Sequence, residues 1–389
     1  MNIEEVASKY AGYQVEMRRH FHRHPEVSGK EYETSKMVKA ELDKIGVEWV
    51  PCGLETGVLA TIKGEKPGKT ILLRGDMDAL TVDEQTGAPY ASENPGVMHA
   101  CGHDCHTSML LTAAHILNDM KSELCGTVKL AFQPAEEIAA GAKSMIEQGA
   151  MDGVDGCFGI HVWADVPSGK VSVEAGPRMG AVGQFRIDVK GKGGHGAAPH
   201  QCVDAALVTA SIVSNLQALV SREISPMEPA VVTAGVIEAG TRWNVVAESG
   251  RIEGTTRCFS NAVYDAFPEM LDRIAKETAK AYRAEAGLTE YMELVPPTVN
   301  DPDMSEIAQA AARKVVAKDA PVTSPATMGG EDFAFYMRKA PGAVALLGIG
   351  NEECGAVWPQ HSGRFCVDES ALIKGAMLYV QVAMDFNAK

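Results

Sequence analysis

Residues 70–80, TILLRGDMDAL, form an apolar run that ends in two aspartates. We interpret the apolar part as a buried strand. Two more predicted strands also end in polar side chains: Glu136 and Glu137 follow VKLAFQPA, and His161 follows CFGI. In open α/β sheets, ligands collect outside the carboxyl ends of the strands. The sequence therefore predicts three strand ends that converge on one crevice.

The order of the predicted elements indicates the fold class. Through residue 162, short β-type runs alternate with helical ones, which is typical of an α/β layer with a mixed, partly parallel sheet. Residues 184–295 follow the order βαββαβ of a ferredoxin-like domain. The part after Pro296 is short for a core of its own, so we expect it to complete the first sheet. The predicted domains are 1–178, an inserted 179–296, and 297–389.

Composition limits the class of protein. The chain has 389 residues, of which 46% are hydrophobic and 22% charged, as in ordinary globular proteins. Its 36 basic and 51 acidic residues leave a net charge of −15. That balance argues against nucleic acid or an anionic membrane as a partner, because phosphate binding needs a surplus of Lys and Arg. No apolar run approaches the ~20 residues of a membrane helix.

The amino terminus and the cysteines indicate the compartment. The start MNIEEVASKY lacks the basic region and apolar core of a secretory signal, so we do not expect export. Nine cysteines, an odd number, are scattered without a compact framework of spacings. We therefore expect reduced thiols in a cytoplasmic protein.

Residues 99–106, HACGHDCH, are the densest cluster of metal-binding side chains. Thiolate and imidazole suit zinc and related transition metals, and carboxylates accept harder ions. Together with Glu136 and Glu137, this cluster predicts a site for two divalent metals that share a water. One glutamate would bind metal while the other moves a proton. The plainer alternatives are a glycine-containing turn that caps a helix from about His106, and a glutamate pair that favours a helix dipole.

Residues 19–24, RHFHRH, form a second histidine-rich tract. His20 and His24 would share one helix face, but Arg19 and Arg23 beside them would repel a cation. We therefore do not expect a metal site in this tract.

Several motifs resemble a known family. They are RRHFHRHPEVSGKEYET, RGDMDAL, MHACGHDCHTSMLL, FQPAEE, GIHVW, GGHGAAPH, GGEDFAFY and PQHSGRF, in the family's order. The chain is similar over residues 14–385 to metal-dependent amidohydrolases such as hippurate hydrolases, N-acyl-amino-acid deacylases and auxin-conjugate hydrolases. The resemblance implies a discontinuous metallohydrolase domain and an inserted lid that forms a dimer contact.

The resemblance also implies roles for particular residues in the hydrolase domain. Glu136, the first acid of PAEE, matches the general base, and Asp78 matches a residue that orients a ligand. A thiolate bridge between the two ions is expected from the cysteine. The implied ligands of two divalent ions (Zn, Mn, Co or Ni) are Cys101, His103, Glu137, His161 and His361.

Three lid residues are expected to meet the substrate, an N-acyl-L-amino acid with an N-acetyl, N-benzoyl or related group. His195 of GGHGAAPH matches a histidine that stabilises the oxyanion, in its own or a partner subunit. Asn244 matches a polar residue near the substrate. Arg257 would pair with the substrate carboxylate, and the alternative is a surface charge at a strand edge. The expected assembly is a homodimer or higher homo-oligomer formed through the lid.

Other functions stay open from the sequence. The same chemistry would serve a dipeptidase or an N-succinyl-amino-acid desuccinylase. A thiol hydrolase would use Cys101 as nucleophile and His103 as base. A third alternative is a metal- or ligand-binding protein without activity, although such a protein has no need of a base at Glu136.

Overall fold

The computed structural model describes residues 2–389 and divides them into two compact units. The first runs up to Gly176 and includes residues 300–325 and 332–389, while the second comprises 177–299 and 326–331. This division places 326–331 in the second unit, whereas the predicted domain boundaries put that segment after the insertion. The predicted boundaries stay a proposal.

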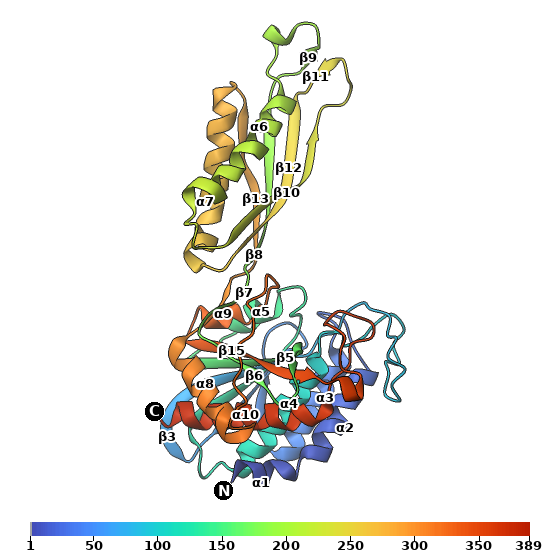
Figure 1. The fold of residues 1–389 in the computed structure, drawn as a ribbon, viewed down its shortest axis with the longest axis vertical. Helices are drawn as coiled ribbons and strands as arrows, with labels where there is room; N and C mark the ends of the chain where they lie inside the picture. Colours follow the sequence, from blue (N-terminus) through green and yellow to red (C-terminus); the bar gives the residue numbers. More distant parts are fainter. Residues whose placement is uncertain (1) are drawn as a thin grey trace. The chain divides into compact units, whose positions relative to one another are not determined.

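A seven-stranded sheet forms the centre of the first unit (Figure 1). Its strands, in spatial order, are β1 (Glu48–Pro51), β2 (Val58–Lys63), β4 (Cys125–Gln133), β3 (Lys66–Asp76), β5 (Gly156–Pro167), β15 (Gly342–Gly350) and β6 (Val171–Ser172). The pairs β4–β3, β3–β5 and β5–β15 are parallel, and the outer pairs are antiparallel. β15 is buried along almost its whole length, as is usual for a parallel strand covered on both faces. The predicted mixed, partly parallel sheet is confirmed.

Helices cover both faces of this sheet. One apolar core includes residues of α1 (Ile3–Ser8), α2 (Ala11–Arg23), α3 (Tyr32–Ile45), α4 (His103–Asp119), α8 (Pro302–Val315) and α10 (Leu372–Asn387). A smaller core on the other face contains α5 (Gly141–Glu147) and α9 (Ala334–Met337). α4 begins at His103, three residues before the predicted start. Among residues 2–389, none of the helices is both long and apolar enough to cross a bilayer.

The second unit has the predicted ferredoxin-like order (Figure 1). The elements along the chain are β8 (Val182–Lys190), α6 (Ala205–Ala218), β10 (Ala230–Ala239), β12 (Ser249–Cys258), α7 (Asn261–Ala281) and β13 (Glu285–Val295). The antiparallel sheet has the order β10-β12-β8-β13, and both helices share its apolar core. Two short ribbons were not predicted: β9 (Gly194–His195) with β11 (Val245–Val246), and β7 (Gly176–Met179) with β14 (Thr298–Asn300).

Candidate metal centre

Five side chains of the first unit form two overlapping groups of metal-binding atoms. One donor atom from each of Cys101, His103 and His161 lies within 4.8 Å of the others, and the same holds for Cys101, Glu137 and His361. Cys101 belongs to both groups. Its Sγ lies 3.4 Å from Nε2 of His161, and Nε2 of His361 lies 3.6 Å from Oε1 of Glu137. The structure thus brings all five predicted ligands together around one thiol.

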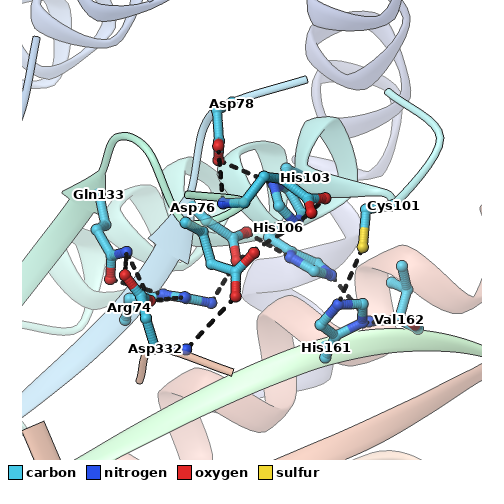
Figure 2. Close-up of polar contacts among 12 residues, drawn as sticks. Arg74, Asp76, Asp78, Cys101, His103, His106, Gln133, His161, Val162 and Asp332 are labelled. Carbon is cyan, nitrogen blue, oxygen red and sulfur yellow. Dashed lines mark hydrogen bonds and ion pairs between the residues drawn. The ribbon is translucent and has the colours of Figure 1, made fainter. Parts of the chain in front are cut away.

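The backbone directs the first group toward a common point. His103 is the first residue of α4 and follows Gly102, whose φ of 93° is in the left-handed region. A Cβ at Gly102 would lie 2.4 Å from Cγ2 of Val162, so a side chain there would push the helix start away from β5. His161 lies on β5, and its Nδ1 is 2.7 Å from the carbonyl oxygen of Val162. This bond leaves Nε2 directed at Cys101 (Figure 2).

Asp78 contacts two of the candidate ligands. Its Oδ1 lies 3.1 Å from Nδ1 of His103, and its Oδ2 accepts the backbone N–H of Glu137 at 3.0 Å (Figure 2). The hydroxyl of Ser28 donates to the same Oδ2 at 2.6 Å. Because Nδ1 of His103 is held in this way, Nε2 is the nitrogen available to an ion.

The buried donor atoms of this site suit a bound cation. Nε2 of His103 and Oε1 of Glu137 are buried, and neither makes a hydrogen bond of ordinary geometry among the described residues. Buried polar atoms are nearly always paired, so two such atoms pointing into one cluster suit a bound ion. Thiolate, imidazole and carboxylate donors match Zn²⁺ and its neighbours in the transition series.

The electrostatics of the cluster agree with this fit. Burial raises the pKa of the Cys101 thiol well above its ordinary value, so its thiolate needs a cation beside it. Burial, together with the neighbouring His106, lowers the pKa of His161, which keeps that imidazole neutral and able to bind a metal. Burial also raises the pKa of Glu137.

Glu136 lies beside the ligand cluster in a strained turn. Donor atoms of His103, Glu136 and Glu137 lie within 4.8 Å of one another. Ala135 and Ala139, on either side of the acidic pair, have φ angles of 53° and 55°, in a region that L-residues rarely adopt. His361 has a φ of 65°. Such strain collects at functional sites.

The buried Arg74 supports the turn at Glu136 through Asp332. Arg74 on β3 contacts Asp76, and its Nη2 donates to Oδ1 of Asp332 at 2.9 Å (Figure 2). The backbone N–H of Asp332 in turn donates to Oε1 of Glu136 at 3.4 Å. Our sequence reasoning did not assign a role to Arg74 or Asp332. Two features of the sequence could have pointed to them: an arginine inside an apolar strand, and the acids of GGEDFAFY.

Two other histidines of the HACGHDCH cluster lie close by. Nδ1 of His106 is 2.5 Å from Oδ1 of Asp76, and its Nε2 accepts the backbone N–H of Val162 at 2.8 Å. His106 is therefore already paired on both ring nitrogens. His99 is buried, neither of its ring nitrogens has a hydrogen bond to any of the residues 2–389, and burial lowers its pKa to about 4.

His22 of the histidine-rich tract at 19–24, together with the preceding Arg18, contacts the start of α4. Nε of Arg18 lies 2.9 Å from Oδ2 of Asp104, and Nδ1 of His22 lies 2.7 Å from the same oxygen. Asp104 directly follows His103, so these contacts hold the helix end that carries the candidate ligand.

The three predicted substrate residues lie in the second unit. His195 on β9 pairs with Val245 on β11, and the carbonyl oxygen of Asn244 accepts the N–H of Gly196 at 3.0 Å. His195 and Asn244 are therefore close together. Arg257 on β12 donates to Oγ1 of Thr255 at 2.8 Å and has no carboxylate partner in residues 2–389. Their part in substrate binding stays a prediction.

Comparisons with known proteins show the family of this chain. The family model described as peptidase family M20/M25/M40 matches residues 72–385. An N-acetylcysteine deacetylase of Bacillus subtilis is 40% identical over 372 residues, covering 95% of this chain and 96% of the relative. Thermostable carboxypeptidase 1 of Saccharolobus solfataricus is 39% identical over 378 residues, covering 96% and 95%.

A solved structure extends the similarity to the fold. The YxeP protein of Bacillus subtilis, a dinuclear metal-binding peptidase from the M20 family, superposes with a TM-score of 0.83 at 36% identity. The match covers 97% of this chain and 98% of the other. On these matches the chain belongs to peptidase family M20/M25/M40.

Proposed function

We propose that this protein, a metal-dependent amidohydrolase, hydrolyses the amide bond of N-acyl-L-amino acids with Glu136 as the general base. The observation that carries the proposal is the pair of donor groups that share Cys101, with Glu136 within 4.8 Å of two of their members. The N-acetylcysteine deacetylase among the relatives supports this substrate class.

The residues that would hold two divalent ions are Cys101, His103, Glu137, His161 and His361. When bound, such ions supply Lewis-acid polarisation of the amide carbonyl and make a water easier to deprotonate. The two groups share the thiol of Cys101 and no other member, so each group offers a position for one ion.

Glu136 would move the proton. One carboxylate oxygen takes a proton from the attacking water, and the same group then gives it to the departing amine nitrogen. The N–H of Asp332 donates to Oε1 of Glu136 at 3.4 Å and so orients this carboxylate. Asp78 would keep the ring of His103 in place throughout.

The second unit would supply contacts to the rest of the substrate. We assign stabilisation of the oxyanion to His195 and a polar contact to Asn244. Arg257 would pair with the substrate carboxylate, because its guanidinium has no acidic partner within the part of the chain that the structure describes.

Replacing Glu136 tests the proposal directly. A Glu136→Gln protein should keep its metal content and lose turnover by ~10²–10⁴-fold, because the amide cannot accept the proton. Glu147→Gln, on the exposed end of α5, is the matched control and should behave like the unaltered protein. Metal analysis and kinetics on N-acetyl, N-benzoyl and dipeptide substrates form the assay. Unchanged turnover in Glu136→Gln would remove this residue from the role.

A dipeptide substrate is the second candidate, and the carboxypeptidase relative favours it. The same substrate panel separates the two, because an N-acyl-amino-acid hydrolase should turn over the N-acetyl and N-benzoyl compounds faster. A thiol hydrolase is disfavoured, since burial raises the pKa of Cys101 and the free thiolate is scarce.

We also propose that the second unit forms a homodimer. β10 is an edge strand, and its Val231, Val236 and Ile237 are exposed, as is Leu207 on α6. Exposed apolar edge strands favour pairing with another chain. Light scattering after gel filtration should give twice the 41.4 kDa chain mass, and Ile237→Lys should shift it toward the monomer.

A further inference from the structure

Glu31 carries a carboxylate that is fully buried and far along the chain from the acidic pair. Its side chain is 0% exposed. Oε1 accepts the backbone N–H of Gly29 at 2.7 Å and that of Ala135 at 2.9 Å. Oε2 accepts the hydroxyl proton of Thr56 at 2.7 Å. All three donors are neutral, so no cation compensates the charge at these contacts.

Burying such a group is costly. Acidic side chains are rarely fully buried unless they are paired, because the charged form loses its hydration. Burial raises the pKa of Glu31, which reflects this cost. A carboxylate retained there in spite of the cost needs a structural or functional reason.

The strained backbone of Ala135, which donates its N–H to Glu31, is such a reason. Its φ of 53° is unfavourable for an L-residue, and it directly precedes Glu136. The carbonyl oxygen of Ala135 accepts the N–H groups of Ala140 and Gly141, both at 3.2 Å, and so closes the turn. Its own N–H goes to Glu31. Both backbone groups of the strained residue are therefore occupied.

We propose that Glu31 is a positioning residue for the general base: its carboxylate holds the N–H of Ala135 and thereby the left-handed turn that presents Glu136. This inference rests on the function proposed for Glu136. Glu31 touches neither substrate nor metal ligands in this scheme and acts through the backbone alone. An error of ~1 Å in a catalytic group can cost ~10² in rate, which sets the size of the expected effect.

The chemistry of the contact gives a matched pair of variants. Glu31→Gln keeps an oxygen that accepts the N–H of Ala135, and its amide can donate to the Thr56 hydroxyl. We expect its kcat to stay within about threefold of the unaltered protein. Glu31→Met has a similar length and no acceptor, so its kcat should fall ~10²-fold with KM within about twofold and metal content unchanged.

Ala135→Gly tests the route of the effect. Glycine adopts positive φ without steric cost, so the turn then depends less on Glu31. Adding Ala135→Gly to Glu31→Met should recover at least about tenfold in kcat. A merely structural role for Glu31 would not be repaired by a glycine in the turn. If Glu31→Met does not fold, Thr56→Val gives a milder test, because it removes one hydrogen-bond donor to Glu31. Its kcat should fall about threefold to tenfold.

Glu41→Met is the control, because Glu41 is also buried, lies on α3, and accepts side-chain hydrogen bonds from Tyr13 and Lys44. The proposal is overturned if Glu31→Met and Glu41→Met have the same kcat, or if Ala135→Gly gives no recovery. Glu136→Gln, assayed in parallel, distinguishes a failure of the proposed function from a failure of the role proposed for Glu31. An active Glu136→Gln refutes the proposed function, whereas an inactive Glu136→Gln with a fully active Glu31→Met refutes only the role of Glu31.

Discussion

Asp78 accepts the backbone N–H of Glu137 at 3.0 Å through Oδ2, and its Oδ1 lies 3.1 Å from Nδ1 of His103. One carboxylate therefore holds two candidate ligands that come from different segments of the chain. The buried Asp78 is itself held by the hydroxyl of Ser28. Burial alone would raise the pKa of Asp78, but His103 and Ser28 lower it, so the carboxylate is charged near neutral pH.

Asp78→Asn should weaken metal binding. The amide can present its oxygen to His103 or to the N–H of Glu137, and its NH₂ repels whichever donor remains. Loss of such a partner typically costs 10–100-fold in metal affinity. Competition with a fluorescent zinc chelator measures the change. Asp83→Asn, on an exposed stretch nearby, should leave the affinity as it was. Equal affinities for the two variants would show that Asp78 does not orient His103.

Cys101→Ala and Cys105→Ala distinguish the shared thiol from a neighbouring one. Both cysteines are buried, at 8% and 0% exposure, but only Cys101 belongs to the donor groups. Cys101→Ala should lose most of its metal because both groups lose a member. Cys105→Ala should keep its metal and fold with a small loss of stability. Elemental analysis of the purified proteins checks this, and full occupancy in Cys101→Ala would contradict the ligand assignment.

Removing metal should lower thermal stability as well as activity. An ion that binds only the folded chain stabilises it by ~2.7 kcal/mol at 100 times its Kd. For a chain of 389 residues, with ~2.1 cal/mol/K of unfolding entropy per residue, we expect Tm to drop by ~3 °C for each such ion removed by a strong chelator. Differential scanning fluorimetry and turnover, measured with and without chelator, give both readouts. Turnover that survives the chelator but is abolished by thiol alkylation would favour the thiol hydrolase instead.

The side chain of Asp368 should make the free energy of unfolding depend on pH in the acid range. Partial burial would raise its pKa, but hydrogen bonds from Asn351 and Ser370 lower it from 3.8 to about 2. A carboxyl with a lowered folded pKa adds stability above pH 3.8, and this is lost as the pH falls toward 2. With solvent screening, the contribution is on the order of 1 kcal/mol.

Asp368→Asn provides the comparison. The difference in unfolding free energy between it and the unaltered protein should be largest at pH 6 and smaller at pH 3. Urea unfolding at the two pH values measures it. A difference that stays constant with pH would mean that the side chain acts through packing or neutral hydrogen bonds.

Local sequence patterns predicted much of the architecture. Alternating strands and helices indicated the α/β sheet, and the order βαββαβ indicated the ferredoxin-like unit, because periodicity and turn residues are local properties. The start of α4 was placed three residues late. Residues 3–22 have a helical periodicity that predicts one helix, whereas the structure has α1 and α2 there, because element ends depend on capping and packing as well as on pattern.

In the candidate site, too, the sequence predicted the residues and the structure decided how they are arranged. Motif chemistry selected Cys101, Glu136 and the other donors, since few side chains combine thiol, imidazole and carboxylate in so short a stretch. Their roles stay predictions, while their proximity is a result of the structure.

The sequence by itself predicted which residues carry the chemistry and determined the kind of fold in which they are placed. Only the tertiary structure decided how closely these donor atoms gather, and that Glu31 and Arg74 support the turn at Glu136. The reason is physical. Propensity and periodicity act over a few residues, whereas the distance between side chains remote in sequence depends on strand order and on how the two faces of the sheet are packed.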